Sequence, residues 1–172
     1  YSMPAMLFPA VCTSVSTVFL PLYIEKLHNN DKLEADKYGS NVLSVSICLA
    51  ILLSIIAVVF APIIVKILAP GFDESTQQMS IFFTRIVMSA FPFLMVQYIL
   101  TAIMNAQKKF GVPQMSGLVL NIIIIISVVV LANKIGIIAL IMGLVVGYVG
   151  VVIYLIIFIR KRFKYKVTIH ID

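Results

Sequence analysis

Polar side chains inside apolar segments are the residues of this chain whose types and spacing could do chemistry. Arg85 is the most prominent, because it lies within the apolar stretch from about residue 79 to residue 105. A charged side chain in a membrane is costly and therefore marks a candidate binding site. Two interpretations of Arg85 are open. Its guanidinium snorkels to the membrane surface, or it faces inward and binds a carboxylate or the phosphate of an anionic lipid.

A first polar stripe lies near the start of the chain. Thr13, Ser16 and Thr17 share one face of a predicted helix, because residues three and four apart lie on the same side. Small hydroxyls of this kind either make interhelical hydrogen bonds or line a hydrated cavity. Both interpretations are open.

A second polar stripe lies in the same apolar stretch as Arg85. Gln97, Thr101 and Asn105 recur at intervals of four residues, and Asn121 follows in the next apolar segment. Interhelical hydrogen bonding and a hydrated path are again both open. The candidate residues of a substrate path are Thr13, Ser16, Thr17, Arg85, Gln97, Thr101, Asn105 and Asn121.

The residue combinations that catalysis requires are missing from the sequence. It has no carboxylate pair, no phosphate-binding glycine loop, no cluster with metal-ligand spacing and no nucleophile beside a base. Cys12 and Cys48 lie in apolar runs without CxxC spacing, and we expect both to be small buried hydrophobes. His28 and His170 are expected to be solvated. We therefore predict no enzyme, no metal site and no cofactor.

The elements that position these polar residues are predicted to be membrane-spanning helices. Of the 172 residues, 62% are hydrophobic and 12% are charged, and the mean hydropathy is +1.11. A soluble domain has about 45–50% apolar and about 25% charged residues. The alternating pattern of a membrane barrel strand is absent, since the run 122–126 is apolar on every face. The fold class is therefore an all-α, polytopic transmembrane helix bundle.

Five stretches meet the requirement of about 20 mainly apolar residues for crossing about 30 Å of hydrocarbon. They form a single transmembrane domain over residues 1–172, with spans at about 3–24, 40–68, 79–105, 115–132 and 136–159. The expected connections are a charged loop over Glu25–Lys37, a Pro70-Gly71 turn within Ala69–Gln78, a loop over Ala106–Gln114 and a tight turn over Asn133–Ile135.

Prolines and glycines predict local departures from regular helix packing. We expect local kinks or breaks at Pro4, Pro9, Pro21, Pro62 and Pro92. Gly143 and Gly147 form a GxxxG pattern, which Gly150 extends, and this predicts close packing of two helices.

Basic residues are unequally divided between the two sides of the predicted bundle. Ten follow the first, third and fifth spans, namely Lys26, Lys32, Lys37, Lys108, Lys109, Arg160, Lys161, Arg162, Lys164 and Lys166. The other side has three, Lys66, Arg85 and Lys134. The positive-inside rule therefore predicts a cytoplasmic C-terminal end and an exterior Tyr1, which predicts at least one further helix upstream. The net charge is +6. Because the basic residues of the richer side are spread over three loops, they favour contact with anionic membrane lipids over nucleic acid.

Four local patterns follow one another along the chain. They are the stretch Ser14–Tyr23 with Phe19 and Pro21, the turn Ala69-Pro70-Gly71-Phe72, the segment Thr84-Arg85-Ile86, and the loop Asn105–Pro113 with Phe110. Together they resemble the MurJ/MviN family of lipid II flippases, of the multidrug/oligosaccharidyl-lipid/polysaccharide exporter superfamily. The matching features are that family's second helix, the APGF after its third helix, the arginine opening its fourth helix and the asparagine, phenylalanine, proline loop that follows. Asn121 also falls where that family often has asparagine.

The resemblance implies that the five spans are helices two to six of a fourteen-helix fold. It implies a flippase that moves the lipid-linked peptidoglycan precursor, lipid II, across the bacterial cytoplasmic membrane by alternating access. The implied partners are this lipid-linked substrate, the membrane lipids and the remaining helices of the same polypeptide. A related exporter of another polyprenyl-linked glycan or of a drug, and a non-transporting membrane scaffold, are the alternatives.

Two departures from the family pattern bear on substrate binding. Met6–Ala10 contains no cation where many members have an arginine facing the central cavity, and Ser89 stands where the family has a proline, with Pro92 nearly a turn later. Cations outside this chain would therefore have to bind more of the pyrophosphate.

Overall fold

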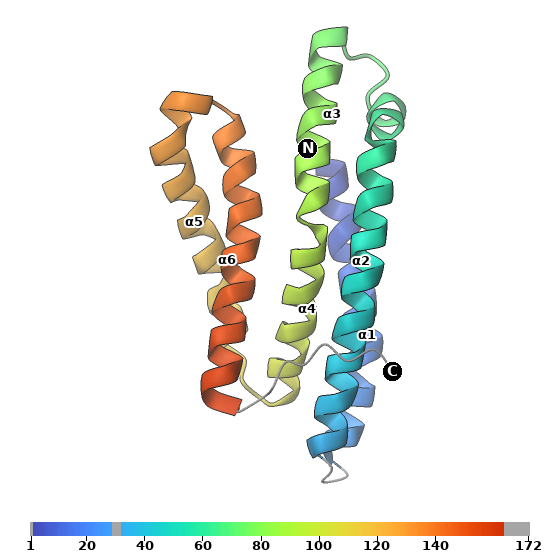
Figure 1. Cartoon of the computed structure of the whole chain (residues 1–172), viewed down its shortest axis with the longest axis vertical. Helices are drawn as coiled ribbons and strands as arrows, with labels where there is room; N and C mark the ends of the chain where they lie inside the picture. The colour runs from blue at the N-terminus through green and yellow to red at the C-terminus, as the bar shows by residue number, and fades with distance from the viewer. Residues whose placement is uncertain (1, 29–31, 164–172) are drawn as a thin grey trace.

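Six helices account for the five apolar segments, because the third segment is divided in two (Figure 1). In this computed structural model, the helices are α1 (Ser2–His28), α2 (Lys32–Leu68), α3 (Glu74–Ser89), α4 (Phe91–Ala106), α5 (Gly111–Ile135) and α6 (Ile138–Phe163). The structure describes residues 2–28 and 32–163, and the side chains of residues 9–28 and 34–160. The tail Val167–Asp172, which includes His170, and the end of the basic run, Lys164–Lys166, lie outside these residues.

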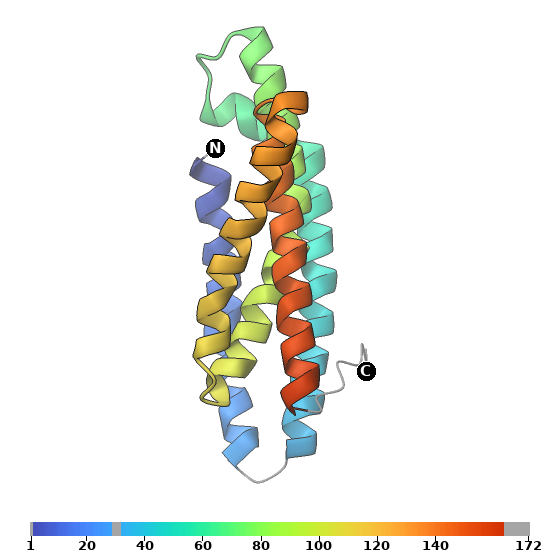
Figure 2. The same cartoon turned by 90° about the vertical axis from the view of Figure 1, so that its left-hand side faces the viewer.

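The helix α4 is the central element of the bundle. It packs against α1, α2 and α6, while α5 and α6 form a hairpin at one side (Figures 1 and 2). One apolar core joins α1, α2 and α4 and includes Phe19, Tyr23, Leu43, Met95 and Ile99. A second core joins α4 to α6 through Leu100, Met104, Val151, Leu155 and Ile159.

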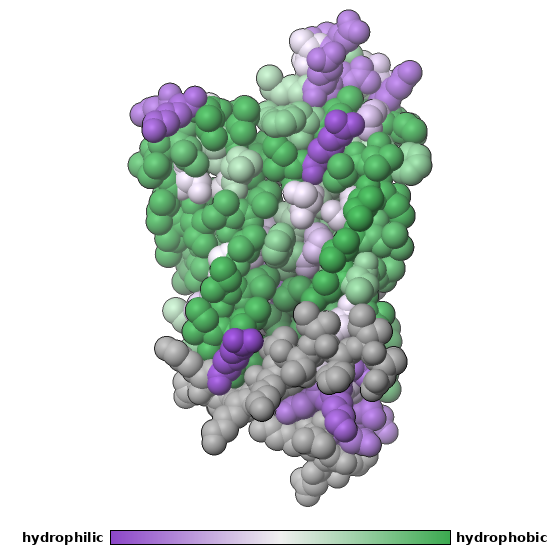
Figure 3. All heavy atoms as spheres, viewed as in Figure 1, coloured by the Kyte–Doolittle hydropathy of each residue, from purple (hydrophilic) through white to green (hydrophobic). Residues whose placement is uncertain are grey.

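The outer surface of the bundle is suited to lipid. Five helical segments are long and apolar enough to cross a membrane, namely Pro9–His28, Glu34–Leu68, Glu74–Ala106, Gly111–Ile135 and Ile138–Arg160. Large apolar side chains such as Val59, Ile67 and Val129 are exposed on them. Figure 3 shows the result on one face, where an apolar band separates polar groups at the two ends. The chain is therefore a multi-pass membrane protein, as its composition predicted.

The connections alternate between the two ends of the bundle. The C-terminal end of α1, the α4–α5 connection and the C-terminal end of α6 lie at one end (Figures 1 and 2). The α2–α3 and α5–α6 connections lie at the opposite end. This is the arrangement that successive antiparallel spans require.

The four predicted connections are wrong in extent. The helix α3 already begins within the expected Ala69–Gln78 connection, at Glu74, and α5 begins within the expected Ala106–Gln114 loop, at Gly111.

The expected loop over Glu25–Lys37 is largely helical, since α1 continues to His28 and α2 begins at Lys32. Polar contacts support these helix ends, because Lys26 lies 3.5 Å from Glu34 and 5.7 Å from the ring centroid of Tyr38.

The expected turn at Asn133–Ile135 is likewise helical, and the chain turns one residue later. Gly136 ends α5 with φ 58° and ψ −136°, a conformation that side chains disfavour and glycine allows.

The expectation that both cysteines are buried is right for Cys12 and wrong for Cys48, which is exposed on α2.

The prolines differ in their effect. Pro9, Pro21 and Pro62 lie inside helices that continue through them. The helix of the third span is interrupted at Ala90, two residues before Pro92.

The predicted turn between α2 and α3 is present, and the side chain of Asp73 caps α3 by accepting a hydrogen bond from the Thr76 N–H.

Candidate functional site

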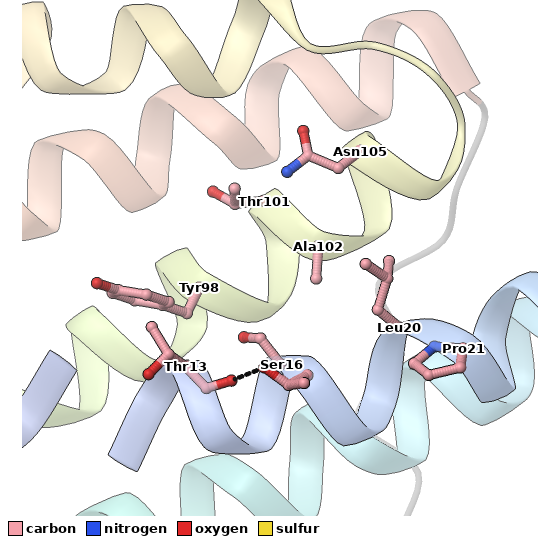
Figure 4. Close-up of a pocket in the computed structure, with 9 residues that line it drawn as sticks. Thr13, Ser16, Leu20, Pro21, Tyr98, Thr101, Ala102 and Asn105 are labelled. Atoms are coloured by element: carbon pink, nitrogen blue, oxygen red, sulfur yellow. Dashed lines mark hydrogen bonds between the residues drawn. The ribbon is translucent and has the colours of Figure 1, made fainter. Parts of the chain in front are cut away.

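A cavity of about 380 Å³ lies between α1 and α4 (Figure 4). Its lining residues are Thr13, Ser16, Thr17, Leu20, Pro21, Tyr98, Thr101, Ala102 and Asn105. The two polar stripes of the sequence therefore meet in space, since α1 supplies one and α4 supplies the other. Five of the eight predicted path residues line this cavity.

The hydroxyls of α1 differ in their hydrogen bonding. Thr13 Oγ1 donates to the carbonyl oxygen of Ala10 at 3.0 Å, and Thr17 Oγ1 donates to that of Thr13 at 2.7 Å. Ser16 Oγ is buried and has no hydrogen-bond partner among the described residues. A buried polar group without a partner costs about 1–3 kcal/mol. A water molecule or a ligand group in the cavity would remove this cost.

Most of the cavity lining is apolar, and the polar groups in it are uncharged. Asn105 offers two donors and one acceptor from its side-chain amide, and Tyr98 and Thr101 add hydroxyls. No Asp, Glu, Lys or Arg is among the lining residues. The chemistry therefore fits water, sugar hydroxyls or amides better than a phosphate, which pairs preferentially with cations.

Tyr98 and Ala102 line the cavity although the sequence pattern pointed to Gln97. A helix turns by about 100° per residue, so steps of four residues drift by about 40° each. Positions 98, 101, 102 and 105 stay on one face, whereas Gln97 is rotated away from it. Its Oε1 is buried without a hydrogen-bond partner among the described residues. Spacings of three and four taken together would have identified Tyr98.

The remaining predicted path residues lie elsewhere. Arg85 is exposed on α3 and Asn121 is exposed on α5, and neither lines the cavity. No described carboxylate lies within salt-bridge distance of Arg85. The structure therefore separates the cation of the third span from the uncharged cavity.

The glycines of α6 allow a close approach of α5. A Cβ atom at Gly143 would lie 2.8 Å from the Ser127 Cβ, and one at Gly147 would lie 2.7 Å from the Leu120 Cδ1. Phe110 immediately precedes α5 and is 58% exposed. Pro113 follows within the first turn of α5, where the missing N–H costs no helical hydrogen bond.

These features define the class of protein: a multi-pass transmembrane helix bundle with a pocket between α1 and α4 that contains uncharged polar groups. The profile of the family described as "Lipid II flippase MurJ" matches residues 3–170. The chain therefore belongs to the MurJ family.

Individual relatives agree with this assignment. The chain is 25% identical over 151 residues to "Probable lipid II flippase MurJ" of Rickettsia prowazekii (strain Madrid E), covering 86% of this chain and 30% of that protein. It is 32% identical over 145 residues to "Probable lipid II flippase MurJ" of Buchnera aphidicola subsp. Baizongia pistaciae (strain Bp), covering 81% and 28%. The chain spans less than a third of the length of these two relatives.

A solved structure is similar across almost the whole chain. It is "Lipid II flippase MurJ, inward closed conformation", with a TM-score of 0.74 and 26% sequence identity. The match covers 97% of this chain and 36% of the solved one. The helix arrangement described above is thus that of part of a MurJ-type bundle.

Proposed function

We propose that the complete protein containing this chain flips lipid II, a lipid-linked peptidoglycan precursor, across the bacterial cytoplasmic membrane. The match of the family profile to residues 3–170 is the observation that carries this proposal. The chain supplies the spans corresponding to helices two to six, and the further helices of the same polypeptide complete the transporter.

The cavity between α1 and α4 is proposed to form part of the path of the substrate head group. A flippase must move a polar head through about 30 Å of hydrocarbon while the prenyl tail stays in lipid. Ser16, Thr101 and Asn105 offer hydrogen bonds to uncharged groups of the sugar and peptide. The pyrophosphate then pairs with cations outside this cavity, with Arg85 as the candidate within the chain. Alternating access exposes the path first to one side of the membrane and then to the other.

We further propose that the end of the bundle with the α4–α5 connection faces the cytoplasm. This end has exposed Lys108, Lys109 and Arg160. Basic residues concentrate on the cytoplasmic side of membrane proteins and contact anionic lipid headgroups there. The C-terminal end of α6 is therefore cytoplasmic in the proposed topology.

Rescue of a bacterium depleted of its lipid II flippase tests the proposal. Expression of the complete gene is expected to restore growth and cell shape. A lack of rescue at normal expression and membrane insertion would contradict the lipid II assignment. Reconstitution into vesicles separates the alternatives, because a related exporter would move another polyprenyl-linked glycan or a drug, and a scaffold would move neither.

A further inference from the structure

The break in the third span is bridged by a side chain from a neighbouring helix. Ala90 separates α3 from α4 with φ −81° and ψ −11°. Pro92 has no N–H, so it cannot donate to the carbonyl of Met88 four residues earlier, as a continuous α-helix would require. The Ser54 hydroxyl of α2 donates to this carbonyl oxygen at 2.7 Å.

The surroundings of this hydrogen bond exclude water. Ser54 is 7% exposed, Met88 4% and Ala90 2%. A carbonyl oxygen buried in such surroundings is costly without a donor. The Ala90 N–H is directed at this oxygen and at that of Val87, and the Ser54 hydroxyl adds the donor that Pro92 cannot supply.

The two halves of the span are held to different degrees. Among the described residues of α3, only Met88 is buried, and it lies in the last turn. In α4, by contrast, eight residues are buried, from Phe91 to Met104. The helix α4 packs against α1, α2 and α6, whereas α3 packs mainly against α2 and α6. Hence α4 is fixed in the core, and α3 is held more loosely on the far side of Ala90.

We propose that Ala90 is a hinge between α3 and α4, and that Ser54 is the positioning residue that sets its angle. Tilting α3 moves the Met88 carbonyl relative to α2, so the Ser54 hydrogen bond favours one orientation. The cavity is lined from α1 and α4 and receives no residue from α3 (Figure 4). A movement at Ala90 therefore shifts α3 and Arg85 relative to the cavity. The importance of this movement for transport rests on the proposed function.

A double-mutant cycle on the complete protein tests the role of Ser54. Pro92→Ala restores an N–H that can donate to the Met88 carbonyl. Ser54→Ala is expected to lower the midpoint of thermal unfolding in detergent, and to lower it much less in the Pro92→Ala background. Ser44→Ala is the matched control, because the buried Ser44 hydroxyl donates to Ser40 in its own helix. Its effect should be the same in both backgrounds. An equal effect of Ser54→Ala in both backgrounds would overturn the assignment.

The hinge itself is tested by the distance between spin labels on α3 and α1. Labels at Met79 and Val18 occupy exposed positions, in a protein with Cys12 and Cys48 replaced. Ser54→Ala is expected to broaden the distance distribution, and Pro92→Ala to narrow it. Identical distributions in the parent and both variants would rule out the hinge. Neither measurement requires the substrate, so failure to flip lipid II would count against the proposed function alone.

Discussion

Gln107 Nε2 donates a hydrogen bond to Tyr23 Oη at 3.2 Å and so joins the C-terminal cap of α4 to α1. Tyr23 is fully buried, and its ring lies 5.3 Å from that of Phe19, centroid to centroid. Both residues are close in sequence to residues that line the cavity, namely Leu20 and Asn105. The pair therefore fixes the spacing of α1 and α4 at this end of the cavity.

Removing the Tyr23 hydroxyl is expected to destabilise the protein. Tyr23→Phe keeps the ring but takes the acceptor away from Gln107, which should lower the free energy of unfolding by about 1 kcal/mol. Chemical or thermal unfolding in detergent measures this change. Tyr154→Phe in α6 is the control, since Tyr154 packs beside Phe158 in the other core. Equal losses in the two variants would argue against a specific role of the Tyr23–Gln107 bond.

Substitution of Ser16 should reduce transport without reducing stability. Its buried hydroxyl has no partner among the described residues, so Ser16→Ala should leave stability unchanged or raise it slightly. Transport of lipid II in reconstituted vesicles should fall, because the cavity loses a hydrogen-bonding group. Ser14→Ala is the control on the same helix, where the hydroxyl donates to Ala10 and lies outside the cavity lining. Normal transport by Ser16→Ala would exclude this hydroxyl from the path.

Two glycine-to-alanine substitutions should change the stability of the protein in opposite directions. At Gly143 an added Cβ would approach the Ser127 Cβ to 2.8 Å, so Gly143→Ala should separate α5 from α6 and destabilise the protein by about 1–3 kcal/mol. At Gly117, within α5, nothing lies within 4 Å of an added Cβ. Gly117→Ala should therefore stabilise the helix by up to about 1 kcal/mol. Comparison of the two unfolding midpoints tests the close approach of the two helices.

The proposed topology is tested by cysteine accessibility in intact cells. In a protein without Cys12 and Cys48, Phe72→Cys is expected to react with a membrane-impermeant thiol reagent added outside. Phe110→Cys should react only after the membrane is opened. Both positions are about half exposed, at 48% and 58%, so access to the reagent depends on the side of the membrane. Labelling of both from the same side would contradict the five alternating spans.

The cap at the start of α3 should be insensitive to pH over the physiological range. Hydrogen bonds from Ser75 and Thr76 lower the pKa of Asp73 from 3.8 to about 2. Because the folded pKa lies below the unfolded one, the stabilisation is present above about pH 3.8 and is lost as the pH falls towards 2. Hydrogen exchange of the first turn of α3 should therefore rise only in strong acid. Asp73→Asn, which caps without titrating, should remove this dependence.

Sequence alone determined the environment and the coarse architecture of this protein. Hydropathy and charge are properties of each segment by itself, so they identified five apolar segments and the alternation of their connections. The Pro70-Gly71 turn was predictable for the same reason, since turn chemistry is local. The lengths of the helices were not, because Leu27 of α1 and Ala35 and Tyr38 of α2 pack in or against the core beyond the long apolar runs.

Only the tertiary structure decided which polar groups meet. The rotation of each helix about its axis and its depth beside its neighbours follow from packing across the whole bundle, which no local pattern contains. The rotation and depth of α1 and α4 place Ser16 and Asn105 at the same cavity. They also place Tyr98, and not Gln97, in its lining. Those of α2 and α3 place Ser54 beside the Met88 carbonyl, thirty-four positions away in the chain. Pro92 predicted a kink or break in the helix, but the hydroxyl that donates a hydrogen bond at this break comes from another span.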